Sequence, residues 1–377
     1  MKSLIQKIDR LYIDEQSRNS KLVDRLTAAM PQEKIEWVKE KPFARSRGEL
    51  SAGEFDRSKR HLFITKFAGE FFKRCPGSKP GLLCCNYFVL NWGQQCDMNC
   101  SYCYLQSFIN SPVMTLYSNL DQAFEELRAL AKTMGKQKLR VGTGETVDSL
   151  SLDPLTGFAH DIIELFREFP NWTVELKTKS SYVDQFLDVD HAGNAVVSWS
   201  LNPQPVIDSE EHGTASLDER LSAAERCLAR GFPVGFHLDP VIWHPDWEKN
   251  YDTLVDEICR RFKPSQIPFM SIGALRFQPE QRHLMRERFG MKSMVTSAEM
   301  SPSSDGKLRY PVKLRTQMFE RIRGRFMAND PAWKIFLCME TPETWVAGSP
   351  FKNGELHDLF DPKIVHDVAK AQVFHLQ

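Results

Sequence analysis

The segment Cys96-Asp97-Met98-Asn99-Cys100-Ser101-Tyr102-Cys103-Tyr104-Leu105 carries the most chemical information in the chain. Three cysteines fall within eight residues, and thiolates at such short spacings are typical ligands of soft metals and iron–sulfur clusters. A structural zinc site usually has four ligands in two separated pairs, and neither a histidine nor a second Cys-x-x-Cys pair stands at a matching distance downstream. The segment therefore predicts an iron–sulfur site with one iron left open, and a zinc site or a chance grouping of loop cysteines are the alternatives.

Short β-rich runs surround this segment and alternate with amphipathic stretches of about 12 to 16 residues. This alternation predicts βα units, because parallel strands need crossover connections. A closed or partial barrel and an open doubly wound sheet both fit the pattern. The predicted strands cover residues 87–91, 138–141, 173–177, 195–201, 233–238 and 269–275, with a later strand-like run at 334–338, and the predicted helices cover residues 119–134, 155–168, 217–230 and 247–262.

The spacing of the cysteines, with an aromatic residue before the last one, resembles the radical S-adenosylmethionine superfamily. The resemblance implies that Cys96, Cys100 and Cys103 bind a 4Fe-4S cluster and that S-adenosylmethionine chelates its fourth iron. It also implies a reductant such as flavodoxin or ferredoxin, and cleavage of the cofactor to a 5′-deoxyadenosyl radical that abstracts hydrogen from an inert carbon. The fold it implies is α/β: a partial parallel (βα) TIM-like barrel of about six strands, with the site at the carboxyl ends of the strands.

The turn Gly142-Thr143-Gly144-Glu145 follows the second predicted strand. Its glycines permit positive φ and a close approach of the backbone to a ligand. It resembles the superfamily loop that receives the methionine ammonium, which implies that Gly142, Gly144 and Glu145 bind the cofactor. A plain strand-to-helix turn is the alternative. The resemblance also makes Tyr102 a candidate cover for the adenine.

Segments 178–184, 200–202 and 231–247 resemble one subfamily, spore photoproduct lyase and its relatives. With the cysteine segment, this resemblance covers roughly residues 87 to 251. In the lyase, a lysine and a serine lie near the methionine carboxylate, and they match Lys179 and Ser200. A cation and a hydroxyl can both bind a carboxylate. The alternatives are a solvated lysine at a strand end and ordinary turn chemistry.

The chain departs from this subfamily at the hydrogen donor. Spore photoproduct lyase splits a methylene-bridged thymine dimer, and a cysteine shortly after the second strand returns hydrogen to the product radical. Glu145 stands at that position here, and a carboxylate O–H is a poor hydrogen-atom donor. Cys338, at the end of the run 334–338, is a candidate replacement, whereas Cys75 is interpreted as a structural thiol or an alternative donor. Tyr104 matches one of the lyase's aromatic pair and is a candidate catalytic residue, with packing as its alternative.

Charge is unevenly distributed along the 377 residues, although 49 basic side chains balance 49 acidic ones. Residues 1–80 hold 18 Lys or Arg against 11 Asp or Glu, and residues 5–30 have helical spacing. Residues 307–326 form a basic stretch in which Arg315, Arg321 and Arg323 are candidate phosphate ligands. We expect a basic extension at residues 1–80, the radical barrel at 81–290, and an extension that packs on the barrel at 291–377.

Nine cysteines form an odd count, and no apolar run approaches the 18 or so residues of a membrane span. Without an export signal, these features predict a cytoplasmic protein with no membrane association.

Three functions fit these patterns. The first is a lyase-like radical S-adenosylmethionine enzyme that acts on DNA photoproducts, for which a duplex substrate would require base flipping. The second is the same radical chemistry on a small molecule or peptide, which the missing donor cysteine favours. The third is a non-catalytic iron–sulfur or zinc-binding protein.

Overall fold

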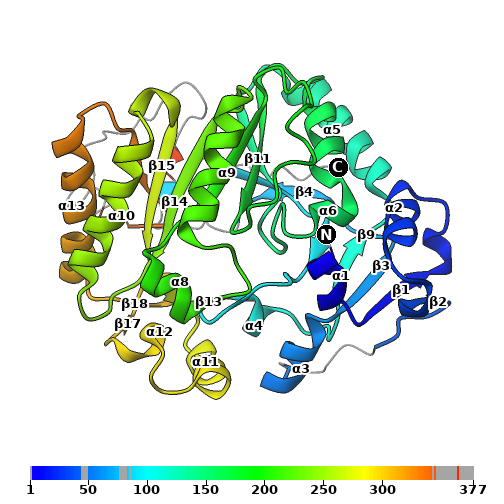
Figure 1. The fold of residues 1–377 in the computed structure, drawn as a ribbon, viewed down its shortest axis with the longest axis horizontal. Coiled ribbons are helices and arrows are strands. Elements are labelled where there is room, and N and C mark those ends of the chain that lie inside the picture. The colour runs from blue at the N-terminus through cyan, green and yellow to red at the C-terminus, as the bar shows by residue number, and fades with distance from the viewer. Residues whose placement is uncertain are drawn as a thin grey trace.

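The computed structural model describes residues 2–43, 50–75, 83–84, 87–341, 344 and 363–364. Its centre is an eight-stranded sheet in the order β19-β15-β14-β12-β11-β10-β6-β4, which curls into an open half-barrel (Figure 1). Its neighbouring strands pair in parallel, except that β4 pairs with β6 in antiparallel orientation. The strands are β4 (Phe72–Arg74), β6 (Tyr87–Leu90), β10 (Leu139–Gly142), β11 (Trp172–Thr178), β12 (Ala195–Ser200), β14 (Val234–Val241), β15 (Phe269–Ala274) and β19 (Ile335–Leu337).

All six predicted strands are confirmed, and their observed ends differ from the predicted ones by at most three residues. The run at 334–338 supplies β19, a seventh parallel strand that pairs with β15. Of the two architectures that the alternation allowed, the half-barrel is the one that forms. The short edge strand β4 was not predicted, because a strand of three residues is too short to show a recognisable alternation of apolar and polar side chains.

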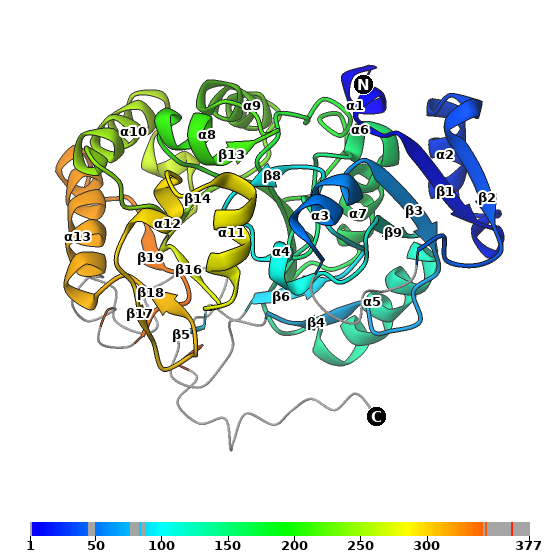
Figure 2. The same cartoon turned by 90° about the horizontal axis from the view of Figure 1, so that it is seen from below.

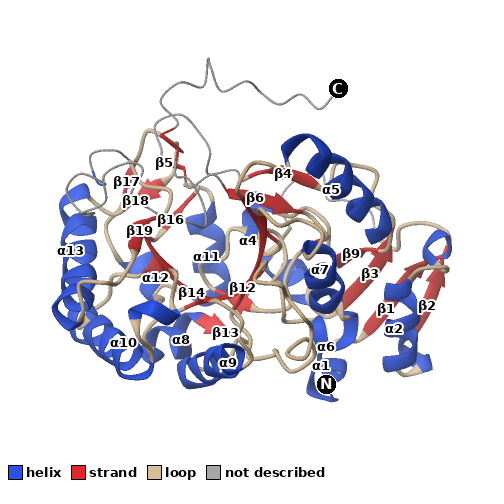
Figure 3. Cartoon of the chain, turned by 90° about the horizontal axis from the view of Figure 1, so that it is seen from above, coloured by secondary structure: helices blue, strands red, loops and turns tan. Residues whose placement is uncertain are grey.

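Helices cover the outside of the half-barrel, and Figure 3 shows α9, α10 and α13 following the curve of the sheet. In α5, Ala123, Leu127, Leu130 and Met134 are buried at helical spacing. The predicted helix at 155–168 is divided at Gly157, whose φ of 60° favours glycine and ends the first piece. The outer helices are α5 (Leu120–Met134), α6 (Asp153–Thr156), α7 (Phe158–Phe166), α9 (Leu217–Ala229), α10 (Trp247–Arg261) and α13 (Val312–Asn329).

A second sheet lies beside the half-barrel in the order β2-β1-β3-β9-β7 (Figure 1). The helical interpretation of residues 5–30 is wrong at its centre, where residues 10–14 form β1. Leu11 and Ile13 are fully buried at a spacing of two because β1 lies between β2 and β3. The elements are α1 (Lys2–Lys7), β1 (Arg10–Asp14), α2 (Lys21–Ala29), β2 (Ile35–Val38), α3 (Ala52–Ser58), β3 (His61–Thr65), β7 (Gly93–Gln94) and β9 (Met114–Tyr117).

Strands β7 and β9 join this second sheet although they follow residue 80, and β19 joins the half-barrel although it follows residue 290. The proposed division of the chain at residues 80 and 290 stays a prediction.

Several short elements gather where the chain leaves the parallel strands, and Figure 2 shows α3, α4 and α11 close together on this side. They are α4 (Leu105–Phe108), α8 (Gln204–Glu210), α11 (Gln281–Phe289), α12 (Met294–Ser297), β8 (Asn99–Cys100), β13 (Glu211–His212), β16 (Arg276–Phe277), β17 (Ser301–Pro302) and β18 (Leu308–Arg309). The remaining elements are β5 (Leu83–Cys84), β20 (Lys363–Ile364) and the 3-10 helices η1 (Glu15–Ser17), η2 (Gln32–Lys34) and η3 (Pro264–Gln266). Among the described helices, none has the length and apolar character to cross a bilayer.

Asp153 at the start of α6 makes the fold sensitive to pH. Desolvation raises the pKa of this buried carboxyl to about 6, although its Oδ1 accepts a hydrogen bond from the backbone N–H of Ala159. The protonated carboxyl is therefore favoured in the folded state. The contribution that this makes to the free energy of unfolding is lost as pH rises from about 4 to 6. Asp153→Asn is expected to remove this loss, which is roughly 3 kcal/mol for a shift of about two pKa units. Urea unfolding of both proteins from pH 4 to 8 measures it, and equal pH profiles would contradict it.

Candidate active site

A cavity of about 430 Å³ lies inside the half-barrel at the carboxyl ends of the strands. Of the predicted site residues, all but Gly142 line it: Cys96, Cys100, Tyr102, Cys103, Tyr104, Gly144, Glu145, Lys179, Ser200 and Cys338. Cys75 lines it as well. Cys227 and Cys259 lie on the outer helices α9 and α10, away from this cavity.

Distant parts of the chain hold the cysteine loop in place. Lys59 Nζ, from the end of α3, donates hydrogen bonds to the backbone carbonyls of Cys96 (2.8 Å) and Met98 (2.5 Å). Gln281 Nε2, from α11, donates to the carbonyls of Tyr102 (3.2 Å) and Cys103 (3.1 Å). The loop is therefore anchored at both ends before any metal binds.

The spacing of the three sulfur atoms bears on which metal they can hold. A tetrahedral zinc ion holds its thiolate sulfurs about 3.8 Å apart. The three sulfurs do not all lie within 4.8 Å of one another, so they do not form such a group. A cluster whose irons each take one thiolate spreads its ligands further apart. The donor set therefore fits an iron–sulfur cluster better than a single zinc ion. Burial raises the pKa of Cys100 to about 12, so the thiol is protonated until a metal displaces the proton.

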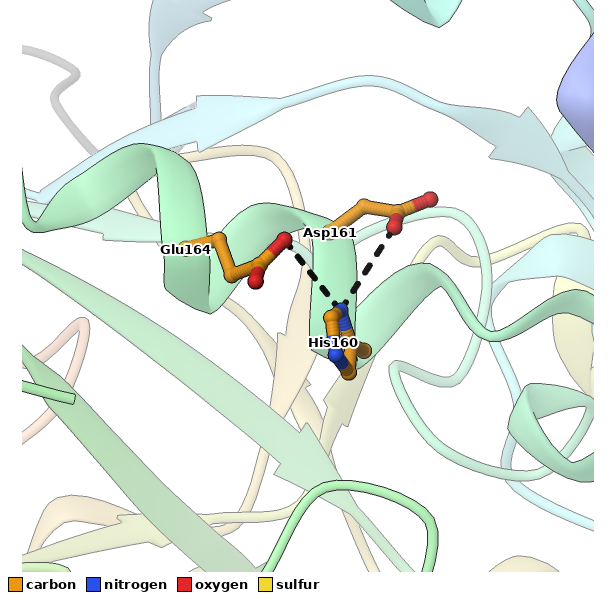
Figure 4. A group of neighbouring side chains, drawn as sticks. All are labelled: His160, Asp161 and Glu164. Atoms are coloured by element: carbon orange, nitrogen blue, oxygen red, sulfur yellow. Dashed lines mark ion pairs between the residues drawn. The ribbon is translucent and has the colours of Figure 1, made fainter. Parts of the chain in front are cut away.

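Within the described residues, one group of three side chains has its ligand atoms close enough together for a single metal ion: His160, Asp161 and Glu164 on α7 (Figure 4). Asp161 already pairs with Lys21 (2.6 Å) and Arg25 (2.6 Å). The group is thus a surface charge cluster that its own cations balance.

A buried network fixes Tyr102 and Lys179 beside the cysteines. Glu211 is fully buried and pairs with Arg220 at 2.6 Å, and its Oε1 accepts hydrogen bonds from Tyr102 (2.5 Å) and Asn202 (2.8 Å). Desolvation is the largest influence on Lys179 and opposes its charged form, but the acidic groups around it, Glu211 first among them, together outweigh desolvation and raise the pKa of the lysine. Lys179 thus remains cationic where the resemblance to the lyase places the methionine carboxylate.

The two glycines of the GTGE turn are required for close approach rather than for positive φ. A Cβ on Gly142 would lie 1.6 Å from the Tyr87 hydroxyl, and one on Gly144 would lie 2.9 Å from the carbonyl oxygen of Lys177. Of the two properties that glycine permits, positive φ and close approach of the backbone, this turn uses the second. The turn is packed directly against two neighbouring strands.

Asp148 ties the GTGE turn to the end of β11. Its carboxylate accepts hydrogen bonds from the Thr178 hydroxyl (2.6 Å) and the backbone N–H of Lys179 (3.0 Å). The same carboxylate accepts from the backbone N–H groups of Leu150 and Ser151. Two candidate cofactor contacts, Glu145 and Lys179, are thereby held on one rigid unit.

Tyr104 and Glu145 meet at the rim of the cavity. The Tyr104 hydroxyl donates to the backbone carbonyl of Glu145 (2.8 Å), while the Glu145 carboxylate pairs with Lys73 of β4 at 3.0 Å. Desolvation, reinforced by the negative charge of Glu145, raises the pKa of the Tyr104 phenol. Its ring is 41% exposed and forms a tilted pair with Phe108, which is 62% exposed. The rim thus presents two aromatic rings to solvent.

The floor of the cavity is polar. Glu175 is fully buried and accepts hydrogen bonds from Ser198 Oγ (2.6 Å) and His237 Nε2 (2.6 Å), and it pairs with Arg140 at 3.5 Å. His237 Nδ1 lies 2.6 Å from Ser271 Oγ. Desolvation, with help from Lys177, lowers the pKa of His237 to about 4, so the imidazole is neutral.

Asp239 and Arg276 form a second charged pair on this floor, joined by hydrogen bonds of 2.9 and 3.2 Å. A Cβ on Gly273 would lie 2.7 Å from Asp239 Oδ1, so the glycine leaves room for the carboxylate. Cys338 directly follows β19, and it lines the same cavity as Arg276.

Glu175, His237 and Asp239 of this floor were not identified as site residues in the sequence, although a signal was present. Glu175, Lys177 and Lys179 alternate with the buried residues Val174 and Leu176 along one strand. Charged residues at a spacing of two in a buried parallel strand indicate an interior that is polar.

Two of the three expected phosphate ligands in the basic stretch at 307–326, Arg315 and Arg321, are already paired with carboxylates of the chain, whereas the expectation for Arg323 stays a prediction. Arg315 is buried and pairs with Glu340 at 3.3 Å, and Arg321 pairs with Asp252 of α10 at 2.7 Å. Arg325 likewise pairs with Asp256 at 2.6 Å. The positive charges of Arg321 and Arg325 therefore serve the packing of α13 against α10.

The sequence model of the spore photoproduct lyase family matches residues 54–310. Spore photoproduct lyase of Bacillus subtilis (strain 168) is 30% identical over 172 residues, which are 45% of this chain and 50% of the relative. The protein of the same name from Geobacillus sp. (strain Y412MC61) is 29% identical over 197 residues, which are 52% and 58% of the two chains. The chain thus matches about half the length of these curated relatives.

Solved structures share the fold. Spore photoproduct lyase complexed with dinucleoside spore photoproduct superposes with a TM-score of 0.77 at 22% identity, over 88% of this chain and 98% of the other. A doubly substituted variant with bound AdoMet and dinucleoside spore photoproduct superposes with a TM-score of 0.76 at 22% identity, over 89% and 98%. At this identity the likeness shows the half-barrel fold alone.

Proposed function

The chain belongs to the spore photoproduct lyase family, and from this membership we propose that it is a radical S-adenosylmethionine enzyme that acts on a DNA photoproduct. One observation carries the proposal: the three cysteines, Gly144 and Glu145 of the GTGE turn, Lys179 and Ser200 come from separate βα units and line one cavity.

Cys96, Cys100 and Cys103 would hold a 4Fe-4S cluster, reduced by a protein such as flavodoxin or ferredoxin. When bound, the cluster and S-adenosylmethionine supply the 5′-deoxyadenosyl radical by one-electron cleavage of the sulfonium. The chain orients the reacting groups and excludes water. The hydrogen bonds from Lys59 and Gln281 to backbone carbonyls of the cysteine loop support the orienting role, because they hold the loop in place.

The cofactor would extend from the cysteine loop along the GTGE turn. Lys179 and Ser200 would receive the methionine carboxylate, Glu145 and the backbone at Gly142 and Gly144 would receive the ammonium, and Tyr102 would cover the adenine. Lys73 would have to share or release Glu145, because it pairs with that carboxylate at 3.0 Å.

A DNA lesion would reach the cavity past the two aromatic rings at its rim. The exposed pair Tyr104 and Phe108 supports stacking of an unpaired base, which a flipped nucleotide requires. Tyr104 would then contact both substrate and loop. The structures of relatives that hold a dinucleoside spore photoproduct support the same substrate class.

A second candidate function is the same radical chemistry on a small molecule. The carboxylate of Glu145 at the position of the lyase's donor thiol favours it, as do the charged residues on the cavity floor.

The test is anaerobic reconstitution with iron and sulfide, reduction by dithionite, and assay of 5′-deoxyadenosine from S-adenosylmethionine. A 4Fe-4S spectrum with cofactor cleavage supports the enzyme, and ultraviolet-irradiated DNA or a spore photoproduct dinucleotide then tests the substrate. A well-formed cluster that never cleaves the cofactor, with or without these substrates, would leave the non-catalytic iron–sulfur protein. Zinc in place of iron would rule out the radical enzyme.

Cys338 is the proposed hydrogen donor, because it is a thiol on the cavity wall and an S–H bond is weaker than the C–H bond it would form. The thiyl radical left on its sulfur would take one electron from the same reductant and a proton from solvent to restore the thiol. A thiol exchanges its hydrogen with solvent, so turnover in D2O is expected to place deuterium in the product. Cys338→Ala is expected to lose this label while cofactor cleavage continues, and mass spectrometry of the product measures it. Cys75→Ala is the matched control on the same cavity. If the deuterium label were lost in Cys75→Ala and kept in Cys338→Ala, Cys75 would be the hydrogen donor instead.

A further inference from the structure

We propose that the floor of the cavity is a binding site for an anionic group of the substrate, a carboxylate or a phosphate, and that the ammonium of Lys177 is its ligand. This inference rests on the proposed function, in that it assigns a substrate feature to the same cavity.

The charges on the floor do not balance. Three cations and two carboxylates line it: Arg140, Lys177, Arg276, Glu175 and Asp239. Arg140 pairs with Glu175 at 3.5 Å, and Arg276 pairs with Asp239 at 2.9 Å. His237 adds no charge, because its imidazole is neutral. One positive charge remains, and it belongs to Lys177.

Lys177 makes no hydrogen bond or ion pair through its ammonium to any residue that the structure describes. Its side chain lines the same cavity as His237 and Asp239, and its positive charge lowers the pKa of both. A cation that is half buried in a polar cavity and lacks an acceptor is stabilised by an anion placed in that cavity.

The hydrogen bonds of His237 show why Ser271 does not bind the proposed anion. Glu175 is ionised, so His237 Nε2–H donates to it, and His237 Nδ1 must then accept from the Ser271 hydroxyl. Because that hydroxyl hydrogen is already used, Ser271 cannot donate to an anion. Arg140 and Arg276 each face a carboxylate, whereas the ammonium of Lys177 has no ion pair with a described residue and keeps its donors for an anion.

The proposed cofactor and the anion would occupy different levels of the cavity. Lys177 belongs to β11 and Lys179 follows the last residue of that strand, and both line the cavity. Lys179 lies beside Glu211, Tyr102 and the cysteine loop, whereas Lys177 lies toward His237 and Asp239. An anion at Lys177 would therefore belong to the substrate rather than to the methionine carboxylate.

Two sources share this chemistry: the bridging phosphate of a dinucleotide lesion, and a carboxylate or phosphate on a small molecule. The test uses the oxidised holoenzyme with S-adenosylmethionine, which does not turn over without a reductant. Dissociation constants are measured for dinucleoside spore photoproduct, for the dinucleotide with its bridging phosphate, and for inorganic phosphate.

With a DNA source, wild type is expected to bind the dinucleotide about tenfold more tightly than the dinucleoside, and inorganic phosphate is expected to reduce this preference. Lys177→Met should bind both equally, and Lys177→Arg, which keeps the charge, should restore the preference. Lys249→Met removes an exposed lysine of α10 and should behave as wild type.

With a small-molecule source, inorganic phosphate should bind wild type and Lys177→Arg but not Lys177→Met, and the dinucleotide should show no preference. The inference is overturned if neither phosphate nor the dinucleotide depends on the charge at residue 177. Should Lys177→Met fail to fold, Lys177→Gln replaces it, with folding checked by circular dichroism. Loss of the proposed function has a separate signature, since an enzyme that forms no 5′-deoxyadenosine could still bind phosphate through Lys177.

Discussion

Cys100→Ala is expected to abolish 5′-deoxyadenosine formation and to remove most of the iron. The three thiolates come from one loop, and the loss of one leaves a cluster with two protein ligands. Substitutions of residues that only support a metal ligand typically cost 10- to 100-fold in affinity or activity, and loss of a ligand itself should cost more than about 100-fold. Iron analysis, the visible spectrum and the cofactor-cleavage assay measure the result.

The matched control is Cys259→Ala, because Cys259 is a half-buried thiol on α10 outside the cavity. This control should retain iron and cofactor cleavage. If Cys100→Ala kept both, Cys100 would not be a cluster ligand, and Cys75 on the same cavity would be the first replacement to examine.

Arg220→Met is expected to destabilise the fold by about 3 to 5 kcal/mol. It would leave Glu211 as an ionised carboxylate, 0% exposed, without the guanidinium that lies 2.6 Å away. Arg220 also donates hydrogen bonds to the carbonyl oxygens of Ser200 (2.9 Å) and Ala215 (2.9 Å), and these would be lost as well. The free energy of unfolding, from urea denaturation of the protein without its cluster, measures the effect.

The same helix supplies a control for this prediction. Arg226 of α9 pairs with Asp184 at 3.3 Å, but both side chains are largely exposed, so Arg226→Met should cost less than about 1 kcal/mol. Adding Glu211→Gln to Arg220→Met should recover part of the loss, because it removes the unpaired charge. Equal costs for Arg220→Met and Arg226→Met would show that the buried pair contributes no more than a surface pair.

Local patterns in the sequence were enough to predict the parallel strands and several residues that line the cavity, among them the three cysteines. Buried strands such as β12 are runs of apolar and small residues, and the spacing of the cysteines is a property of one short loop. Residues that follow the strands converge because the carboxyl ends of parallel strands share one edge. These features need no knowledge of which distant segments meet.

The parts that could not be predicted depend on contacts between distant segments. Glu211 reaches Tyr102 across 109 positions because β13 pairs with β8, and neither two-residue strand has a pattern of its own. The basic face of α13 suggested nucleic acid because Asp252 and Asp256, which neutralise it, lie 69 positions earlier. A charged stretch can be interpreted only when its partners are known.

The late position of β19 has a consequence for biosynthesis. This strand pairs with β15 and carries Phe336 and Cys338 to the cavity wall, and it follows Cys103 by roughly 230 residues. While the chain is being translated, the earlier parallel strands can assemble before β19 leaves the ribosome. The cysteine loop can therefore stay accessible from that side until β19 has been synthesised, which would leave an interval for loading the proposed cluster before this part of the wall forms.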